Sequence, residues 1–334
     1  MKENFDVIRK AFALQGKILE VLPLTEGSIH ETYKIRLDTG KIYVFQKMHT
    51  GVFRKPEAVM RNIFRVTKYL QENFPDMQTL HFYQTLSGVP LYQNWRVSAY
   101  IPAQSMKICE NLKQIEQAGM MFGRFQKAVS GMNAEKFCPV LPEFHNTRAY
   151  FQKLLQFHAD MPELEKLKSW QSQACYVCDA YQKNNIPLKV THNDMKCSNL
   201  LFDASGMPVA VIDLDTVMGG MPVYDFGDAV RSFASNTSSS EADLSVVGLN
   251  MQKYKAFASG WFSQTEYSPE ERKLLIPAVF SVTVELAVRY LTDYLQGNIY
   301  FKTDYPEQNL VRTRNQIRLA QEILNGRKEM EKFL

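Results

Sequence analysis

The 334-residue sequence has few cysteines, little excess of either charge and no long apolar run. Its five cysteines are an odd number in a chain large enough to build a core without disulfides, which favours the reducing cytoplasm. The 39 Lys and Arg against 35 Asp and Glu leave a net charge of +4, too small to indicate a nucleic-acid or membrane partner. A hydrophobic share of 45% excludes a disordered chain. One large or two modest globular domains are expected.

Segments typical of secretion or of membrane insertion are also missing. The first six residues lack the apolar stretch of a signal peptide, so no secretory leader is expected. The most apolar segment, residues 274–288, is interrupted by Pro277, Ser281, Thr283 and Glu285. It is shorter than the about 20 apolar residues that a span needs. We expect a buried helix there.

The first hundred residues show mainly strand patterns. Apolar or alternating residues predict strands at 18–24, 33–37 and 42–47, the last two joined as a hairpin. Pro56 precedes apolar residues at helical spacing, and this predicts a helix. Two further strands are expected at 79–86 and 92–101. The predicted order is three strands, one helix and two strands.

Helical patterns dominate after Pro102. Two short apolar strands, at 200–202 and 208–214, interrupt them around a polar turn. Helical spacing then returns from Tyr224 to the end. We therefore expect a first domain over residues 1–102 and a second over residues 103–334.

The segment with the clearest chemistry is residues 190–199, VTHNDMKCSN, which is followed by the predicted hairpin and IDLDT at 212–216. Asn199 and Asp213 offer an amide oxygen and a carboxylate, which suit Mg²⁺ with substrate phosphates as further ligands. Asp194 is then free to accept a proton from a hydroxyl nucleophile. The spacing from His192 through Asp194 to Asn199 is that of a kinase catalytic loop. The pattern predicts phosphoryl transfer.

Neighbouring polar residues have two interpretations each. His192 is expected to brace the loop rather than to carry protons. Lys196 either steadies the transferring phosphoryl charge or is solvated. Asp215, on the same strand face as Asp213, is interpreted as a second metal ligand or an acceptor of substrate hydroxyls. Asp225 is expected to receive backbone N–H bonds from the loop.

These motifs resemble the aminoglycoside phosphotransferase and choline kinase group, which has a protein-kinase-like fold. The resemblance is closer to bacterial N-acetylhexosamine 1-kinases. It rests on four stretches, IDLDTV at 212–217, YDFGDA at 224–229, FHNTR at 144–148 and RYLTDY at 289–294. The resemblance implies an α+β fold of two lobes. The smaller N-terminal lobe has an antiparallel β-sheet and one helix, and the larger C-terminal lobe is mainly helical.

The resemblance also implies ATP and Mg²⁺ as cofactors and assigns residues to the nucleotide. Gly27 and Ser28 are expected to form the phosphate loop, and Lys47, at the end of its strand, to contact the phosphates. Tyr100 and Ile101 correspond to the hinge whose backbone holds adenine. Glu57 is a candidate partner of Lys47, a pairing that the sequence leaves open.

The acceptor is expected to bind the second domain. Arg289 and Asp293 share one helix face, where they form either a surface ion pair or a pair that binds sugar hydroxyls. Asp215, Thr216 and Tyr224 are further acceptor-binding candidates. The resemblance implies a cytoplasmic monomer or weak dimer that phosphorylates the anomeric hydroxyl of an N-acetylhexosamine. Choline, ethanolamine, an aminoglycoside or another hydroxyl acceptor is the alternative, and a non-catalytic binding module is a further one.

Overall fold

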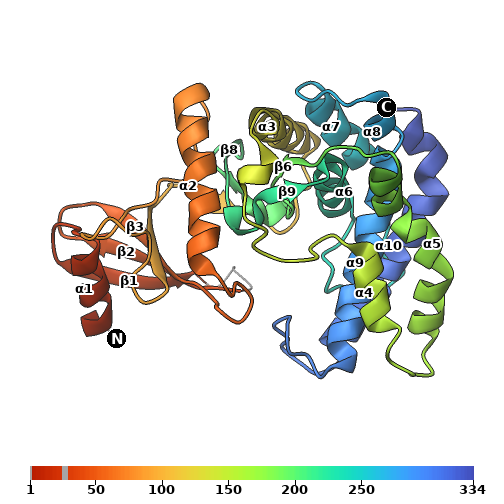
Figure 1. The fold of residues 1–334 in the computed structure, drawn as a ribbon, viewed down its shortest axis with the longest axis horizontal. Coiled ribbons are helices and arrows are strands. Elements are labelled where there is room, and N and C mark those ends of the chain that lie inside the picture. The colour runs from red at the N-terminus through yellow and green to blue at the C-terminus, as the bar shows by residue number, and fades with distance from the viewer. Residues whose placement is uncertain (1, 25–28) are drawn as a thin grey trace. The chain divides into compact units, whose positions relative to one another are not determined.

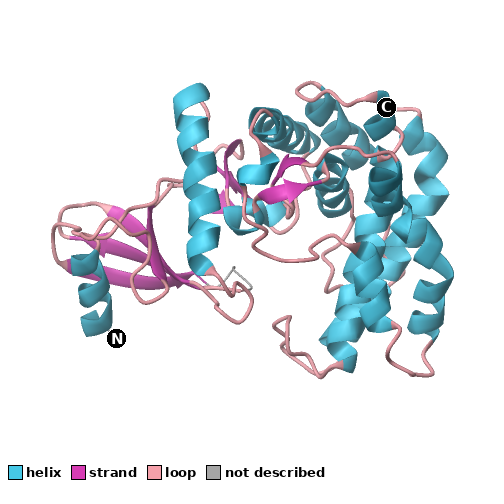
Figure 2. Ribbon diagram, in the orientation of Figure 1, coloured by secondary structure: helices cyan, strands magenta, loops and turns pink. Residues whose placement is uncertain are grey.

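A computed structural model describes residues 2–24 and 29–334. The chain divides into two compact units, Met1–Ala103 and Gln104–Leu334. The first unit combines a β-sheet with two helices, and helices dominate the second (Figure 2).

The first unit is built on a four-stranded antiparallel sheet. Its strands stand in chain order, β1 (Ile18–Leu24), β2 (Glu31–Leu37), β3 (Ile42–Lys47) and β4 (Trp95–Ala99). The helix α2 (Pro56–Asn73) joins β3 to β4. Pro56 stands in the first turn of α2, as expected of a residue without a backbone N–H. These elements match the predicted hairpin and helix.

A helix that the sequence analysis did not anticipate, α1 (Lys2–Ala11), lies beside the sheet (Figure 1). Phe5, Ile8 and Phe12 recur at helical spacing and share a buried cluster with alternate residues of the strands. Among the strand residues of that cluster are Phe45 and Val97. The core of this unit therefore forms between α1 and one face of the sheet.

The prediction of a strand at 79–86 was wrong. Only one isolated bridge, between Phe82 and Ser98, forms there. Backbone bonds to β4 are confined to both sides of that bridge, from the N–H of Tyr83 to Val97 and from the N–H of Ala99 to His81. A turn then begins at Thr85, whose carbonyl accepts the N–H of Gly88. The strand expected at 92–101 is also shorter, because Gln93 and Asn94 have left-handed φ angles of 48° and 66° that form a turn before β4.

The second unit is mainly helical, with two small sheets. Its helices are α3 (Leu112–Ser130), α4 (Thr147–Leu154), α5 (Pro162–Lys183), α6 (Pro222–Phe233), α7 (Met251–Phe262), α8 (Pro269–Arg272), α9 (Leu275–Leu295) and α10 (Gln308–Glu331). One sheet has the order β5 (Gln104–Ser105), β7 (Leu200–Phe202) and β8 (Pro208–Val211). The other pairs β6 (Lys189–Thr191) with β9 (Met218–Gly220). The predicted hairpin is β7 and β8, but the second strand ends at Val211 rather than Leu214. Asp213 has a left-handed φ and begins a short 3-10 helix, Leu214–Thr216, so Asp213 and Asp215 do not share a strand face as predicted.

Helix α9 is the centre of this unit and packs against α4, α5, α6 and α10 (Figure 1). Within the described ranges it is the one helix long and apolar enough to cross a membrane by length and composition. However, 83% of its most apolar window is buried inside the structure. The expectation of a buried helix at 274–288 is confirmed.

Candidate active site

The loop after β6 holds the predicted catalytic residues, and His192 braces it. The ring Nε2 of His192 donates to the carbonyl of Ile212, 2.9 Å away, and Nδ1 accepts the N–H of Asp194 at 3.3 Å. Because each nitrogen serves a different backbone segment, His192 ties the loop to the end of β8. The expected bracing role is confirmed.

Asp225, in the first turn of α6, holds the same loop through hydrogen bonds to its backbone. Its two carboxylate oxygens accept the N–H groups of His192 and Asn193, at 2.8 and 2.7 Å. Burial raises the pKa of Asp225 to about 6, although the nearby His192 and the amide donors oppose the rise. Asn193 has a left-handed φ of 65°, a conformation that asparagine adopts as a single residue. The predicted role of Asp225 is confirmed.

Asp194 is a partly exposed carboxylate with a cation beside it. The ammonium of Lys196 lies 2.7 Å from Oδ2, and the side-chain amide of Asn199 donates to the same oxygen at 2.9 Å. Burial alone would raise the pKa of Asp194, but Lys196 outweighs it and lowers the pKa to about 2. Among the described residues no hydrogen bond engages Oδ1. Asp194 is therefore ionised at neutral pH and keeps one oxygen for a ligand.

Asn199 and Asp213 lie at neighbouring points of the hairpin. Leu200 pairs with Val211, and the N–H of Ile212 donates to the carbonyl of Asn199 at 2.9 Å. Since the Asn199 amide nitrogen binds Asp194, its Oδ1 is the atom left for a cation. Asp213 has a left-handed φ of 60°, which is uncommon outside glycine and occurs at functional sites.

This donor set fits Mg²⁺. The residues described contain no group of three or more His, Cys, Asp or Glu that would hold a metal by itself. A hard cation bound by one amide oxygen and one carboxylate takes its remaining ligands from substrate phosphates and water. The pair suits a metal that arrives with a nucleotide.

Two of the predicted acceptor ligands are engaged inside the protein. The hydroxyl of Thr216 donates to the carbonyl of His192 at 2.6 Å. Tyr224 has no exposed surface, and its hydroxyl lies 3.1 Å from that of Thr147 and 3.2 Å from the Cys178 sulfur. The Thr216 hydroxyl supports the loop and the Tyr224 hydroxyl is held between α4 and α5, so neither faces a ligand, which corrects the prediction. Asp215 is 2% exposed, and its role stays a prediction.

Arg289, half-buried on α9, is surrounded by aromatic rings. Its guanidinium carbon lies within 6 Å of four ring centroids, those of Phe144 (5.0 Å), Tyr150 (5.4 Å), Phe301 (5.5 Å) and Tyr300 (5.8 Å). No hydrogen bond or ion pair to this guanidinium occurs within the described ranges. The rings fix its position while its five N–H donors stay available to a ligand.

Asp293 does not share that environment, which corrects the prediction that it binds the acceptor. Its carboxylate accepts the backbone N–H groups of Ile299, Tyr300 and Phe301 at 2.8–3.0 Å. The side-chain amide of Asn309 adds a fourth bond at 2.9 Å. Asp293 therefore shapes the loop between α9 and α10, and this loop carries two of the rings around Arg289.

Replacing Asp293 with alanine is expected to lower the free energy of unfolding by about 1–3 kcal/mol, because the buried Asn309 side-chain amide and three backbone N–H groups lose their acceptor. Urea unfolding measures the change. Asp160→Ala, at an exposed aspartate, is the matched control. An effect no larger than that of Asp160→Ala would refute the structural role of Asp293.

In the first unit, Lys47 is half exposed and pairs with Glu31 on the neighbouring strand, with 3.8 Å between Nζ and Oε1. Glu57 is exposed and makes no ion pair with Lys47 among the described residues. The predicted phosphate loop at Gly27 and Ser28 lies outside those residues.

The segment predicted to hold adenine follows β4. The N–H of Tyr100 already donates to the carbonyl of Ile42 at 3.2 Å, and the carbonyl of Ile101 accepts from Ala103 at 2.8 Å. The carbonyl of Tyr100 and the N–H of Ile101 bond no other described residue. These two groups belong to one trans peptide and point in opposite directions, so at most one of them can face a bound adenine.

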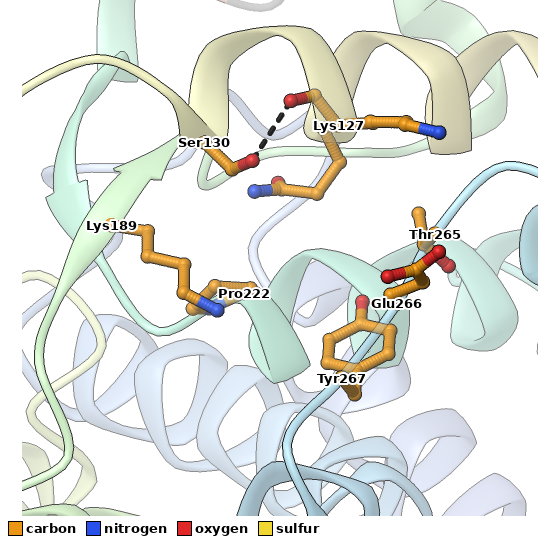
Figure 3. A pocket seen from close by; sticks show the side chains of 8 residues that line it. Lys127, Ser130, Lys189, Pro222, Thr265, Glu266 and Tyr267 are labelled. Carbon is orange, nitrogen blue, oxygen red and sulfur yellow. Dashed lines mark hydrogen bonds between the residues drawn. The ribbon is translucent and has the colours of Figure 1, made fainter.

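A separate cavity of about 230 Å³ lies elsewhere in the second unit (Figure 3). Its lining comes from α3, from Lys189 and Pro222, and from the segment 265–267. The ammonium of Lys189 is bound by both carboxylate oxygens of Glu271, at 2.8 and 3.0 Å. None of the predicted site residues lines this cavity, so it is not the candidate active site.

The sequence analysis missed His145 and Glu285, which adjoin the catalytic loop. The His145 ring lies between the Glu285 carboxylate and the carbonyl of Asn193. The signal was Glu285 itself, an acid within the most apolar segment, since such a group is buried only with a partner.

Comparison with known proteins matches residues 20–257 to the model of the phosphotransferase enzyme family. Similar solved structures share the fold at low identity. A choline/ethanolamine kinase family protein from Mesorhizobium loti has a TM-score of 0.66 at 16% identity, over 100% of this chain and 98% of that one. A microcompartment-associated aminopropanol kinase has a TM-score of 0.67 at 14% identity, over 98% of each chain. The amicoumacin kinase hAmiN, in complex with AMP-PNP, Ca²⁺ and Ami, has a TM-score of 0.63 at 12% identity, over 95% of this chain and 93% of that one.

Proposed function

The chain belongs to the phosphotransferase enzyme family, and from this premise we propose that it transfers the γ-phosphoryl group of ATP to a hydroxyl of a small molecule. The observation that carries the proposal is the arrangement of Asp194, Asn199 and Asp213 around one hairpin. A binding module without catalysis would not need all three. The fold shared with the kinases named above agrees with the proposal.

In this proposal Asp194 accepts the hydroxyl proton at Oδ1 while the oxygen bonds to phosphorus and the bond to ADP breaks. The ion pair with Lys196 keeps Asp194 ionised and places a positive charge beside the transferred group. Asn199 Oδ1 and Asp213 would hold Mg²⁺, which neutralises charge on the phosphate oxygens.

The nucleotide is assigned to residues of the first unit. Lys47 would leave Glu31, an exposed pair of small energetic value, to contact the phosphates. Either the carbonyl of Tyr100, as an acceptor, or the N–H of Ile101, as a donor, would bind adenine.

For the acceptor we propose an N-acetylhexosamine phosphorylated on its anomeric hydroxyl. Arg289 supports this choice, because a planar guanidinium among aromatic rings offers N–H donors to hydroxyls beside apolar faces for the sugar ring. Phe144 precedes His145, which binds the carbonyl of Asn193. Arg289 is thus connected to Asp194 through successive contacts with Phe144, His145 and Asn193.

A cationic acceptor such as choline or ethanolamine is the second candidate, favoured by the similarity to a choline/ethanolamine kinase family protein. The positive charge of Arg289 opposes the binding of a second cation. The aromatic rings that would hold a cation already surround Arg289. Nucleotide consumption measured over a panel of hexosamines, amino alcohols and aminoglycosides tests this proposal. Consumption driven only by amino alcohols would replace the sugar with a cationic acceptor.

Arg289→Ala is expected to raise the KM of the acceptor about tenfold or more, because a hydrogen bond to a charged group contributes about 1.5–3 kcal/mol. The KM of ATP should stay nearly unchanged. Arg148→Ala, which removes an exposed arginine paired with Asp179, is the matched control. Equal effects of Arg289→Ala on both substrates would remove Arg289 from the acceptor site.

A further inference from the structure

His145 has an acceptor at each of its two ring nitrogens. Nδ1 lies 2.9 Å from Glu285 Oε1, and Nε2 lies 2.9 Å from the backbone carbonyl of Asn193. Neither a carboxylate nor a carbonyl can donate a hydrogen bond, and a neutral imidazole carries a single N–H. Both contacts are satisfied together when His145 is an imidazolium.

The second member of the pair is equally enclosed. Glu285 is 1% exposed on α9, and its Oε2 accepts the hydroxyl of Thr147 at 2.7 Å. Burial opposes the charge on each group, but the carboxylate raises the pKa of His145 and the imidazolium lowers the pKa of Glu285. The charged form of the pair is thus the favoured one.

Other elements packed around His145 carry further titratable or charged groups. They are Tyr224, Asp225 and Asp228 of α6, Cys178 of α5 and Arg289 of α9. Of these carboxylates, Asp228 is paired with Arg231 at 2.6 Å. Glu285 is the carboxylate that contacts the His145 ring directly.

The atom that His145 holds belongs to the peptide that leads into Asp194. The Asn193 carbonyl accepts from His145, and the N–H of Asp194, on the same peptide, donates to His192. Fixing both ends of this peptide sets the direction in which the Asp194 side chain leaves the backbone.

We propose that His145 and Glu285 form a buried imidazolium–carboxylate pair that positions Asp194, and that the pair connects the base to α9, the helix that carries Arg289. This inference rests on the proposed function, because an effect on turnover requires that the protein transfers a phosphoryl group. His145 and Glu285 are positioning residues, because neither touches the reacting atoms.

The ion pair is tested first, by nitrogen NMR of the histidine rings in the full-length protein, which needs no activity. In the wild type the His145 ring should still be doubly protonated at a pH above the ordinary histidine pKa of about 6.5, because the Glu285 carboxylate raises the pKa of His145. In Glu285→Gln the ring should be singly protonated at that pH, since the amide can donate to Nδ1. A wild-type ring that titrates near the ordinary value would overturn the ion pair.

Positioning is tested by the double variant His145→Phe/Glu285→Leu, which removes both charges and so avoids leaving one buried charge unpaired. Replacement of a buried pair by apolar residues is often neutral for stability. We expect kcat to fall up to about 10²-fold, because misplacement of a catalytic group by about 1 Å has that effect, with little change in the KM of ATP. Glu285→Gln, which keeps the contact of Nε2 with Asn193, should recover most of the lost turnover.

Wild-type kcat in the double variant would overturn the positioning role. The failure of the proposed function has a different signature, because the wild type itself would then transfer no phosphoryl group while the NMR result stood.

Discussion

Asp194→Asn is expected to reduce turnover by about 10²-fold or more, since general base catalysis contributes that much. The substitution removes the ionised oxygen that accepts the proton but keeps the shape of the side chain, so fold and nucleotide binding should be nearly intact. Steady-state kinetics and thermal unfolding measure both consequences. Asp179→Asn, at an exposed aspartate that pairs with Arg148, is the control. Turnover near that of the wild type would remove Asp194 from the role of base.

Asp213→Ala is expected to abolish metal-dependent binding of the nucleotide. A site with one carboxylate and one amide oxygen from the protein cannot lose the carboxylate and still hold Mg²⁺. Calorimetric titration of ATP with and without Mg²⁺ measures the loss.

A second variant separates metal binding from folding. Because Asp213 has a left-handed φ, alanine adds backbone strain, whereas asparagine tolerates that conformation. Asp213→Asn should therefore fold normally and still lose metal-dependent affinity. Unchanged affinity in both variants would place the metal elsewhere, with Asp215 as the first residue to test.

Much of the fold could be predicted because its signals are local. Strand alternation at β2 and β3, the proline that opens α2 and the apolar spacing of α9 each depend on a few neighbouring residues. In the segment expected to be a strand at 79–86, pairing with β4 is confined to one bridge at Phe82, and a turn starts at Thr85. The apolar content of a segment does not show where its pairing with a neighbouring strand ends.

The residues of the catalytic loop were identified because their spacing carries the chemistry, and the contacts of His192 and Asp225 follow from it. The acceptor side was harder to predict. Helical spacing places Arg289 and Asp293 on one face. It does not reveal that a loop six to eight residues after Asp293 returns its backbone N–H groups to the Asp293 carboxylate. The aromatic rings around Arg289 likewise come from three separate segments.

The central claim, phosphoryl transfer from ATP to a sugar hydroxyl with Asp194 as base, is tested most directly by phosphorus NMR of the reaction mixture. Wild type and Asp194→Asn are compared with N-acetylhexosamine, ATP and Mg²⁺. The proposal predicts a phosphate resonance coupled to the anomeric proton, labile in mild acid, that accumulates with the wild type and scarcely with the variant. Inorganic phosphate as the sole new product of both proteins, or equal rates of sugar phosphate formation by both, would contradict the claim.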